Sequence, residues 1–200
     1  METEKFYHIY NHANRNENLF REEENYRFFL QQWDKYISPI AVTRTYCLMP
    51  NHIHFLIKIR SVEEVRMKFG FEDVKPFGKF QTFQKLVSKQ FSNLYSSYAQ
   101  AFNTRYQRKG SLFTPNFKRK EITSEEYLKT LVCYIHRNPI HHGFCADFTD
   151  WKHSSYHAYL SDKPSKIERT YILDLFDGKE NFIETHQQYI ELLDLEIFLE

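Results

Sequence analysis

Cysteine is scarce in this sequence, and long apolar runs are missing from it. The three cysteines, at positions 47, 133 and 145, are odd in number and form no C-x-x-C pair, which argues against a disulfide framework and suits a reducing cytosol. No run of 18 apolar residues is present, and the opening residues lack the apolar core of a secretory signal. We therefore expect a cytoplasmic protein without a membrane span.

The sequence also contains no internal repeat or low-complexity tract, and it is long enough for a folded core. It has 200 residues, of which 42% are apolar, enough for one domain with an appendage. Aromatic residues make up 18%, with 19 Phe and 14 Tyr. These rings either fill an aromatic core or offer stacking surfaces to nucleic-acid bases.

Acidic residues are absent from residues 75–120, although the whole chain has a net charge of only +1. This segment holds ten Lys and Arg residues, whereas residues 161–200 hold ten Asp and Glu against four Lys and Arg, a balance of −6. A segment of charge +10 favours binding of a polyanion such as DNA, because solvated faces usually mix both signs. An ordinary solvated basic surface is the alternative. The candidate DNA contacts are Lys85, Lys89, Arg105, Arg108, Lys109, Lys118, Arg119 and Lys120.

Hydrophobic periodicity predicts a mixture of strands and helices. Alternating residues predict strands over residues 5–14, 40–49, 52–60 and the end of 111–122, the second and third joined by a turn at Pro50-Asn51. Apolar residues at helical spacing predict helices over residues 22–37, 61–69, 80–106, 123–138, 150–160 and 178–199, with a loop over 70–79. We expect Thr123 to cap the fourth helix together with Glu126, and Pro139 to end it.

Two histidines lie near the start of the strand predicted over 52–60. Strand side chains alternate between faces, so His52 and His54 point the same way, about 6–7 Å apart. Two imidazoles on one face can share a metal ion, although they also suit a plain polar face. His8 and His12 share a face of the first strand, where a structural or surface role is the simpler interpretation.

Tyr134 and Asn138 lie four residues apart on a predicted helix and therefore share a face. Taken alone, Tyr134 suits a packed tyrosine, and Asn138 suits a helix end before a proline. A zinc site built from Cys133, His136, His142 and Cys145 is a competing interpretation, although only five residues separate its two halves. It predicts tightly bound zinc, whereas a two-histidine site predicts an exchangeable ion.

Four ordered motifs resemble those of one family. Leu48-Met49-Pro50-Asn51-His52-Ile53-His54 is similar to its His-hydrophobic-His metal motif. Tyr134-Ile135-His136-Arg137-Asn138-Pro139-Ile140, followed by Gly143 and residues 150–156, resembles the region of its tyrosine helix. Residues 7–11 and 105–113 also match, so that the resemblance covers roughly residues 5–160. The family is that of the REP-associated tyrosine transposases, relatives of the single-tyrosine insertion-sequence transposases.

The resemblance implies a fold, a reaction and the residues of a site. The fold is an α+β, ferredoxin-like antiparallel sheet with flanking helices. The family cleaves single-stranded DNA near hairpins, rejoins strands, and holds the 5′ end as a phosphotyrosine with the help of a divalent metal ion, Mg²⁺ or Mn²⁺. By position, Tyr134 matches the nucleophile. His52, His54 and Asn138 match the groups that hold the ion, Asn138 standing where relatives often have Gln.

The sequence departs from the family at two places. His12-Ala13 stands where the family usually has Arg-Gly, which affects the geometry of the first loop. Residues 161–200 lie outside the resemblance, so we expect a catalytic domain over 1–160 and an acidic helical C-terminal extension over 161–200. Insertion-sequence relatives work as homodimers, whereas the REP-associated branch can act as a monomer, so both assemblies stay open. A non-catalytic DNA hairpin-binding protein on the same fold is the alternative function.

Overall fold

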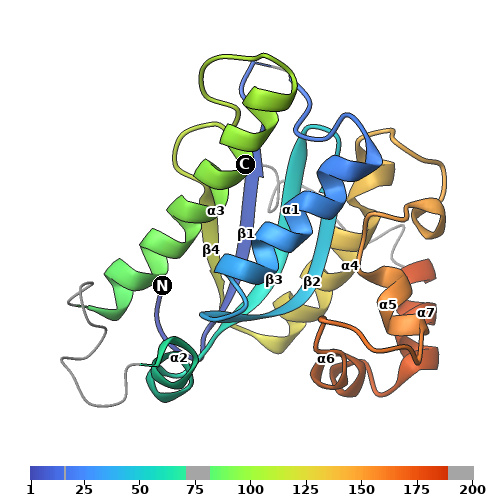
Figure 1. The fold of residues 1–200 in the computed structure, drawn as a ribbon. Coiled ribbons are helices and arrows are strands. Elements are labelled where there is room, and N and C mark those ends of the chain that lie inside the picture. Colours follow the sequence, from blue (N-terminus) through green and yellow to red (C-terminus); the bar gives the residue numbers. More distant parts are fainter. Residues whose placement is uncertain (16, 71–81, 189–200) are drawn as a thin grey trace.

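A computed structural model describes residues 1–15, 17–70 and 82–188 of the chain (Figure 1). The loop predicted over 70–79 therefore lies almost entirely outside the described residues, as does the last part of the helix predicted over 178–199. None of the helices in the described ranges combines the length and the apolar character that a bilayer span requires.

Four antiparallel strands form one sheet in the order β2-β3-β1-β4. The strands are β1 (Phe6–His12), β2 (Ala41–Met49), β3 (His52–Ile59) and β4 (Lys118–Ile122). With the helices α1 (Glu23–Tyr36) and α3 (Phe83–Arg105) they follow one another as β-α-β-β-α-β, and α2 (Val62–Phe69) comes after β3. This order is that of a ferredoxin-like fold, so the predicted α+β architecture is confirmed.

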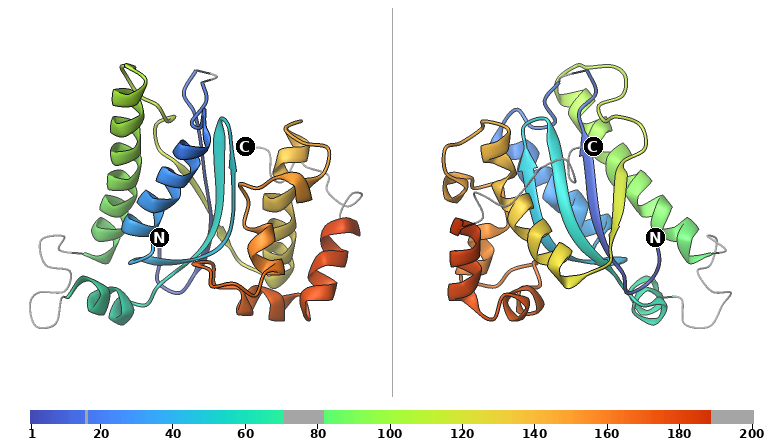
Figure 2. Two further views of the ribbon diagram at one scale, coloured as in Figure 1. Left: turned by 45° about the vertical axis from the view of Figure 1, so that its right-hand side comes forward. Right: turned by 180° about the vertical axis from the view of Figure 1, so that it is seen from behind.

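Helices cover both faces of the sheet. α1 and α3 pack on one face, and α4 (Glu125–His141) packs on the other (Figure 2). Strand β3 is apolar on both sides because it is sandwiched: Phe55 joins the core beneath α1 and α3, whereas Leu56 joins the core beneath α4. His52 and His54 have the same parity as Leu56, so they face α4.

Two details of α4 differ from the prediction. Its N-cap is Ser124 rather than Thr123, because the Ser124 hydroxyl accepts a hydrogen bond from the Tyr127 amide at 3.2 Å. Pro139 lies inside the helix, which continues to His141. The helix tolerates this proline near its end because later amides still find carbonyls, with His142 N–H donating to Asn138 O at 3.1 Å. Asn138 is therefore a helical residue and not the residue at which the helix stops.

The chain after α4 covers the edge of the sheet and the back of α4. The backbone of residues 153–155 pairs with strand β2, with Leu48 N–H donating to His153 O and Ser155 N–H donating to Tyr46 O, both at 2.9 Å. The helix predicted over 150–160 therefore begins only at Tyr156 (α5, Tyr156–Leu160), after a 3-10 turn at Phe148–Asp150 (η2). This pairing shields one edge strand from other chains.

Two further helices lie within the C-terminal extension, α6 (Thr170–Leu175), which the sequence did not predict, and α7 (Lys179–Gln188). Ile172, Phe176 and Phe182 belong to the same hydrophobic cluster as Leu131 and Ile135 of α4. The extension is thus packed against the back of α4 over the residues described, and the division of the chain at residue 160 stays a prediction.

A chain of buried hydrogen bonds joins α7 to α4. His186 Nδ1 lies 2.7 Å from Phe182 O, which can only accept, so the His186 hydrogen is on Nδ1. His186 Nε2 must then accept from His136 Nδ1 at 2.8 Å, and His136 Nε2 accepts from the Ser155 hydroxyl at 2.8 Å. The Ser155 hydroxyl also lies 3.3 Å from Tyr46 O, a longer contact than the one to His136. Both imidazoles are neutral because burial lowers their pKa, that of His186 to about 4.

We expect His186→Leu to destabilise the protein and to weaken its response to acid. At pH 7 the variant leaves the buried His136 N–H without an acceptor, which costs about 1–3 kcal/mol. In the wild type, His186 titrates near 6.5 when unfolded and about 4 when folded, so stability is complete above pH 6.5 and falls as the pH drops toward 4. This histidine alone accounts for a loss of about 2 kcal/mol between pH 6.5 and 5, which the variant lacks.

Urea unfolding at pH 7 and pH 5 measures both effects. His157→Leu, at an exposed position of α5, serves as the control and should match the wild type at pH 7. An unchanged pH dependence in His186→Leu would contradict the neutral His186 assigned here.

Candidate metal and nucleophile site

Polar side chains gather in the α4-facing layer of the sheet, on its two central strands. In the pairing of β1 with β3, Tyr10 lies opposite His54 and His12 lies opposite His52. Residues 8, 10 and 12 of β1 therefore share a face with the two histidines of β3. α4 packs over this face and brings Tyr134 and Asn138 across it.

The two histidines of β3 lie side by side and almost fully buried. The ring centroids of His52 and His54 are 5.2 Å apart, and the side chains are 1% and 4% exposed. Burial lowers the pKa of His52 to about 3 and that of His54 well below its usual range, so both imidazoles are neutral at physiological pH. A neutral imidazole is the form that binds a metal ion.

Asn138 completes this pair from the opposite helix. Its Oδ1 lies 3.1 Å from His52 Nε2, although the two residues are 86 positions apart in the chain, and Asn138 is fully buried. The structure thus brings together two imidazoles and an amide oxygen, which are the three groups that the motifs single out.

The two ring nitrogens of His52 both face oxygen atoms, and they cannot both donate a hydrogen bond. Its Nδ1 lies 2.7 Å from Asn51 Oδ1, and its Nε2 lies 3.1 Å from Asn138 Oδ1. A neutral imidazole has only one N–H, so one of these nitrogens directs a lone pair at an oxygen. Asn138 Nδ2 is buried and has no hydrogen-bond partner. A divalent cation between His52 Nε2 and Asn138 Oδ1 would satisfy both lone pairs, as would an amide turned to present Nδ2 to the ring. The donor set therefore fits a metal ion.

Tyr134 lies against the same histidines. Its ring meets that of His54 edge-on, with centroids 5.7 Å apart at an angle of 89°, and the side chain is 3% exposed. Burial raises the pKa of Tyr134, and the neighbouring Asn138 side chain partly offsets that rise. The phenol is therefore protonated at neutral pH and would need to lose its proton in order to act as a nucleophile.

His8 lies closer to the histidine pair than the sequence indicated. It is 3% exposed, and its Nε2 lies 2.8 Å from His54 Nδ1. His12 is exposed but stacks on His52 with centroids 4.8 Å apart, and His142 lies at 4.3 Å from the same ring. The sequence places His8 and His12 on one face of a strand, but only the register of β1 against β3 places them beside the histidine pair.

The competing zinc site does not form. Cys133 and His136 face His186 on the far side of α4, whereas His142 lies against His52. Among the residues that the structure describes, no group of three or more His, Cys, Asp or Glu side chains is arranged to hold a metal. His52, His54 and Asn138 are not such a group, because only two of the three residues are of these types.

The basic residues fall into two groups on the surface. Lys118 lies opposite Tyr10 and Lys120 opposite His8 in the pairing of β4 with β1, so both share the face of the histidine pair. Lys120 Nζ also lies 5.3 Å from the centre of the Tyr127 ring. The side chains of Lys85 and Lys89 on α3, Lys109 in the following loop and Arg119 on the other face of β4 are exposed.

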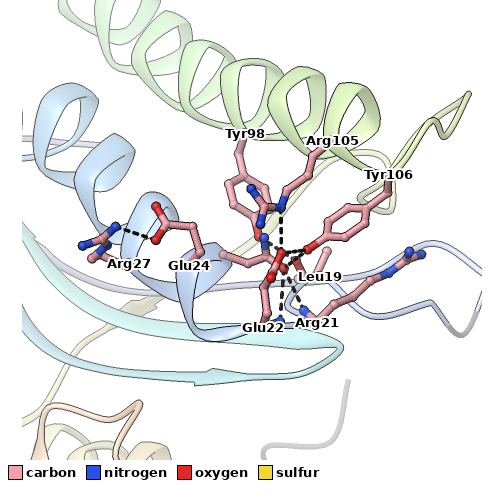
Figure 3. Close-up of polar contacts among 9 residues, drawn as sticks. Leu19, Arg21, Glu22, Glu24, Arg27, Tyr98, Arg105 and Tyr106 are labelled. Atoms are coloured by element: carbon pink, nitrogen blue, oxygen red, sulfur yellow. Dashed lines mark hydrogen bonds and ion pairs between the residues drawn. The ribbon is translucent and has the colours of Figure 1, made fainter.

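Two arginines of the candidate set are held by glutamates. Arg105 Nε lies 2.7 Å from Glu22 Oε1, which also accepts from the Tyr106 hydroxyl (Figure 3). Arg108 forms a two-point ion pair with Glu17 at 2.5 Å for each contact. These pairs tie the end of α3 and its loop to the segment before α1, so glutamates already neutralise part of the charge of Arg105 and Arg108.

A groove of about 360 Å³ with a mixed polar and apolar lining runs between α3 and residues 111–117. Its lining includes the exposed serines 88, 92 and 96 of α3 and the rings of Tyr95 and Phe117. Asn11 also reaches it and accepts a hydrogen bond from the Thr114 hydroxyl at 2.7 Å. The groove thus adjoins the end of β1 that carries His12.

No protein-family model and no curated protein matches the sequence. The structure is similar to that of a REP-associated tyrosine transposase bound to a REP hairpin, with a TM-score of 0.58 and 16% identity over 82% of this chain and 84% of that chain. A bacterial tRNA(His) guanylyltransferase-like protein in complex with GTP is less similar, with a TM-score of 0.42 and 10% identity over 70% of this chain and 66% of that one. The chain therefore has the fold that the sequence motifs predicted, that of the REP-associated tyrosine transposase.

Proposed function

We propose that this chain is a tyrosine transposase of the REP-associated type, which cleaves single-stranded DNA near a hairpin and rejoins it. One observation carries the proposal: on one helix, Tyr134 meets His54 and Asn138 meets His52, in a buried site on the fold of a hairpin-binding transposase. The sequence motifs assign to these residues the roles of nucleophile and metal ligands, and the contacts between them are compatible with both roles.

His52, His54 and Asn138 would hold the metal ion of the reaction through two imidazole nitrogens and an amide oxygen. Nitrogen and oxygen donors of this kind suit Mn²⁺ or Mg²⁺, with Mn²⁺ the better match to imidazole. When bound, such an ion neutralises charge on a phosphodiester and orients it for in-line displacement.

Tyr134 supplies the nucleophile. Its hydroxyl loses its proton as the oxygen attacks the phosphorus, the bond to the 3′ oxygen breaks, and that oxygen takes up one proton and leaves as a 3′-hydroxyl. The DNA 5′ end stays on Tyr134 as a phosphotyrosine, which conserves the energy of the broken bond. A 3′-hydroxyl can later attack this ester and release the tyrosine, so strands are rejoined without ATP.

The basic face of β4 provides the contacts to the DNA backbone nearest to the site. Lys118 and Lys120 project on the same side as His8 and Tyr10, so a strand that reaches Tyr134 passes them. Lys85, Lys89, Lys109 and Arg119 are also exposed and add positive charge elsewhere on the surface. The groove beside α3 offers hydroxyls and aromatic rings to unpaired nucleotides.

We expect Tyr134→Phe to abolish cleavage and to leave DNA binding intact, because the variant removes only the attacking oxygen. The test mixes protein with labelled single-stranded hairpin oligonucleotides, including DNA that flanks its own gene, in Mn²⁺, Mg²⁺ or EDTA and resolves covalent adducts on denaturing gels. Tyr171→Phe, at a tyrosine of α6 remote from the site, is the matched control. Binding without any adduct in the wild type would favour a non-catalytic hairpin-binding protein.

We expect His52→Ala to lower the affinity for Mn²⁺ by roughly tenfold or more, since it removes one of three protein ligands. Calorimetric titration of the metal into the protein measures the affinity, and His157→Ala controls for the loss of a histidine elsewhere. Equal Mn²⁺ affinities in the His52→Ala variant and the wild type would show that this histidine is no ligand.

We expect the double variant Lys118→Gln, Lys120→Gln to reduce the salt dependence of binding to single-stranded DNA. Each phosphate contact contributes about 0.7 to the slope of log K against log salt, so losing two contacts lowers the slope by about 1.4. Fluorescence anisotropy over a range of salt concentrations gives this slope. Lys163→Gln, an exposed lysine beyond α5, should leave it unchanged.

A further inference from the structure

We propose that His8 and Asn51 are positioning residues that fix the tautomers of the two metal-binding histidines. Each places an acceptor at the Nδ1 of one histidine, so that the hydrogen lies on Nδ1 and the lone pair lies on Nε2. Both ligand histidines then present the same nitrogen to one metal ion. The purpose of this arrangement, metal binding, rests on the proposed function. The tautomers themselves are expected in the metal-free protein as well.

The tautomer of His52 follows from its contact with an amide oxygen. Asn51 Oδ1 lies 2.7 Å from His52 Nδ1, and an amide oxygen can only accept. The single hydrogen of the neutral His52 ring is therefore on Nδ1. Its Nε2 carries a lone pair and points to Asn138 Oδ1 at 3.1 Å, which is the place where a shared cation would sit.

The tautomer of His54 depends on which ring donates the hydrogen in its contact with His8. The two nitrogens that face each other, His8 Nε2 and His54 Nδ1, are 2.8 Å apart, and a hydrogen bond between them uses one hydrogen. If His8 supplied it, the hydrogen of a neutral His54 would be on Nε2, and that nitrogen could not bind a metal. If His54 donates instead, its Nε2 is free for the ion and His8 carries its own hydrogen on Nδ1. Only this second state matches the tautomer of His52.

The fold fixes the position of His8 beside His54. In the pairing of β1 with β3, His8 lies opposite Leu56 and therefore diagonally from His54. The rings of His8 and His54 are nearly parallel, at 20° with centroids 5.1 Å apart. The Tyr134 ring meets that of His8 edge-on, with centroids 6.3 Å apart. Since His8 is 3% exposed, solvent is poorly placed to replace its nitrogen as an acceptor.

The first test determines the tautomers in the metal-free protein. Long-range ¹H–¹⁵N spectra of ¹⁵N-histidine-labelled protein distinguish Nδ1–H from Nε2–H, and single substitutions assign the signals. We expect both His52 and His54 to be Nδ1–H, His54 to shift toward Nε2–H in His8→Phe, and the wild-type tautomer to persist in His8→Gln, whose amide oxygen can accept. A wild-type His54 with its hydrogen on Nε2 would overturn the proposal.

The second test measures Mn²⁺ affinity in the same proteins. We expect His8→Phe and Asn51→Ala to bind Mn²⁺ roughly 10- to 100-fold more weakly, and His8→Gln and Asn51→Asp to recover most of the loss, because partners that orient a ligand have effects of this size. Thermal unfolding verifies that each variant is folded, and His157→Phe controls for a substituted histidine elsewhere.

The outcomes separate this proposal from the proposed function. If the wild type binds Mn²⁺ and folded His8→Phe binds it equally well, His8 has no positioning role. If the wild type has the expected tautomers but binds no Mn²⁺, the metal-dependent function is wrong and the tautomer assignment stands.

Discussion

The register of β1 against β3 is the constraint on which the rest of the site depends. It sets His12 opposite His52 and Tyr10 opposite His54, and it leaves His8 one diagonal step away, within 2.8 Å of His54. A shift of one residue would turn the whole histidine face of β1 into the core beneath α1 and α3. Because both strands are central in the sheet and Ile9, Ile53 and Phe55 are fully buried on that other side, the hydrophobic core fixes the register that the polar cluster requires.

The second constraint is the position of α4. Its apolar residues pack on the sheet and its far side packs on the C-terminal extension, through Phe182 and the hydrogen-bonded pair His136 and His186. Arg137 adds a hydrogen bond to the backbone of His186 at 2.8 Å. Tyr134 and Asn138 are therefore held from behind as well as from the sheet. Two residues of the tyrosine motif that do not face the site thus have a role in anchoring the helix that carries it.

Sequence reasoning reached the architecture for physical reasons that are easy to state, and it selected candidate site residues that the structure brings together. Alternation and helical spacing are local signals, so β1, the hairpin of β2 and β3 and the long helix α3 could be placed within a few residues. The same parity rule put His52 and His54 on one face. Tyr134 gave no such signal by itself, and only the ordered motifs singled it out. The contact of His8 with His54, the pairing of residues 153–155 with β2 and the ion pairs of Arg105 and Arg108 join distant segments, which a single sequence does not reveal.

The neutrality of the candidate ligands His52, His54 and Asn138 has a consequence for the proposed chemistry on a phosphodiester. Carboxylate ligands would cancel part of the charge of a bound divalent ion and would repel the phosphate, whereas imidazole and amide ligands leave the whole charge available to it. Burial keeps His8, His52 and His54 uncharged, and Lys120 further lowers the pKa of His8. Negative charge is also missing from residues 75–120, which contain no Asp or Glu, and β4 places Lys118 and Lys120 on the face of the site. A buried neutral centre bordered by lysines suits an anionic strand, whose negative charge would strengthen the binding of a metal ion at the site.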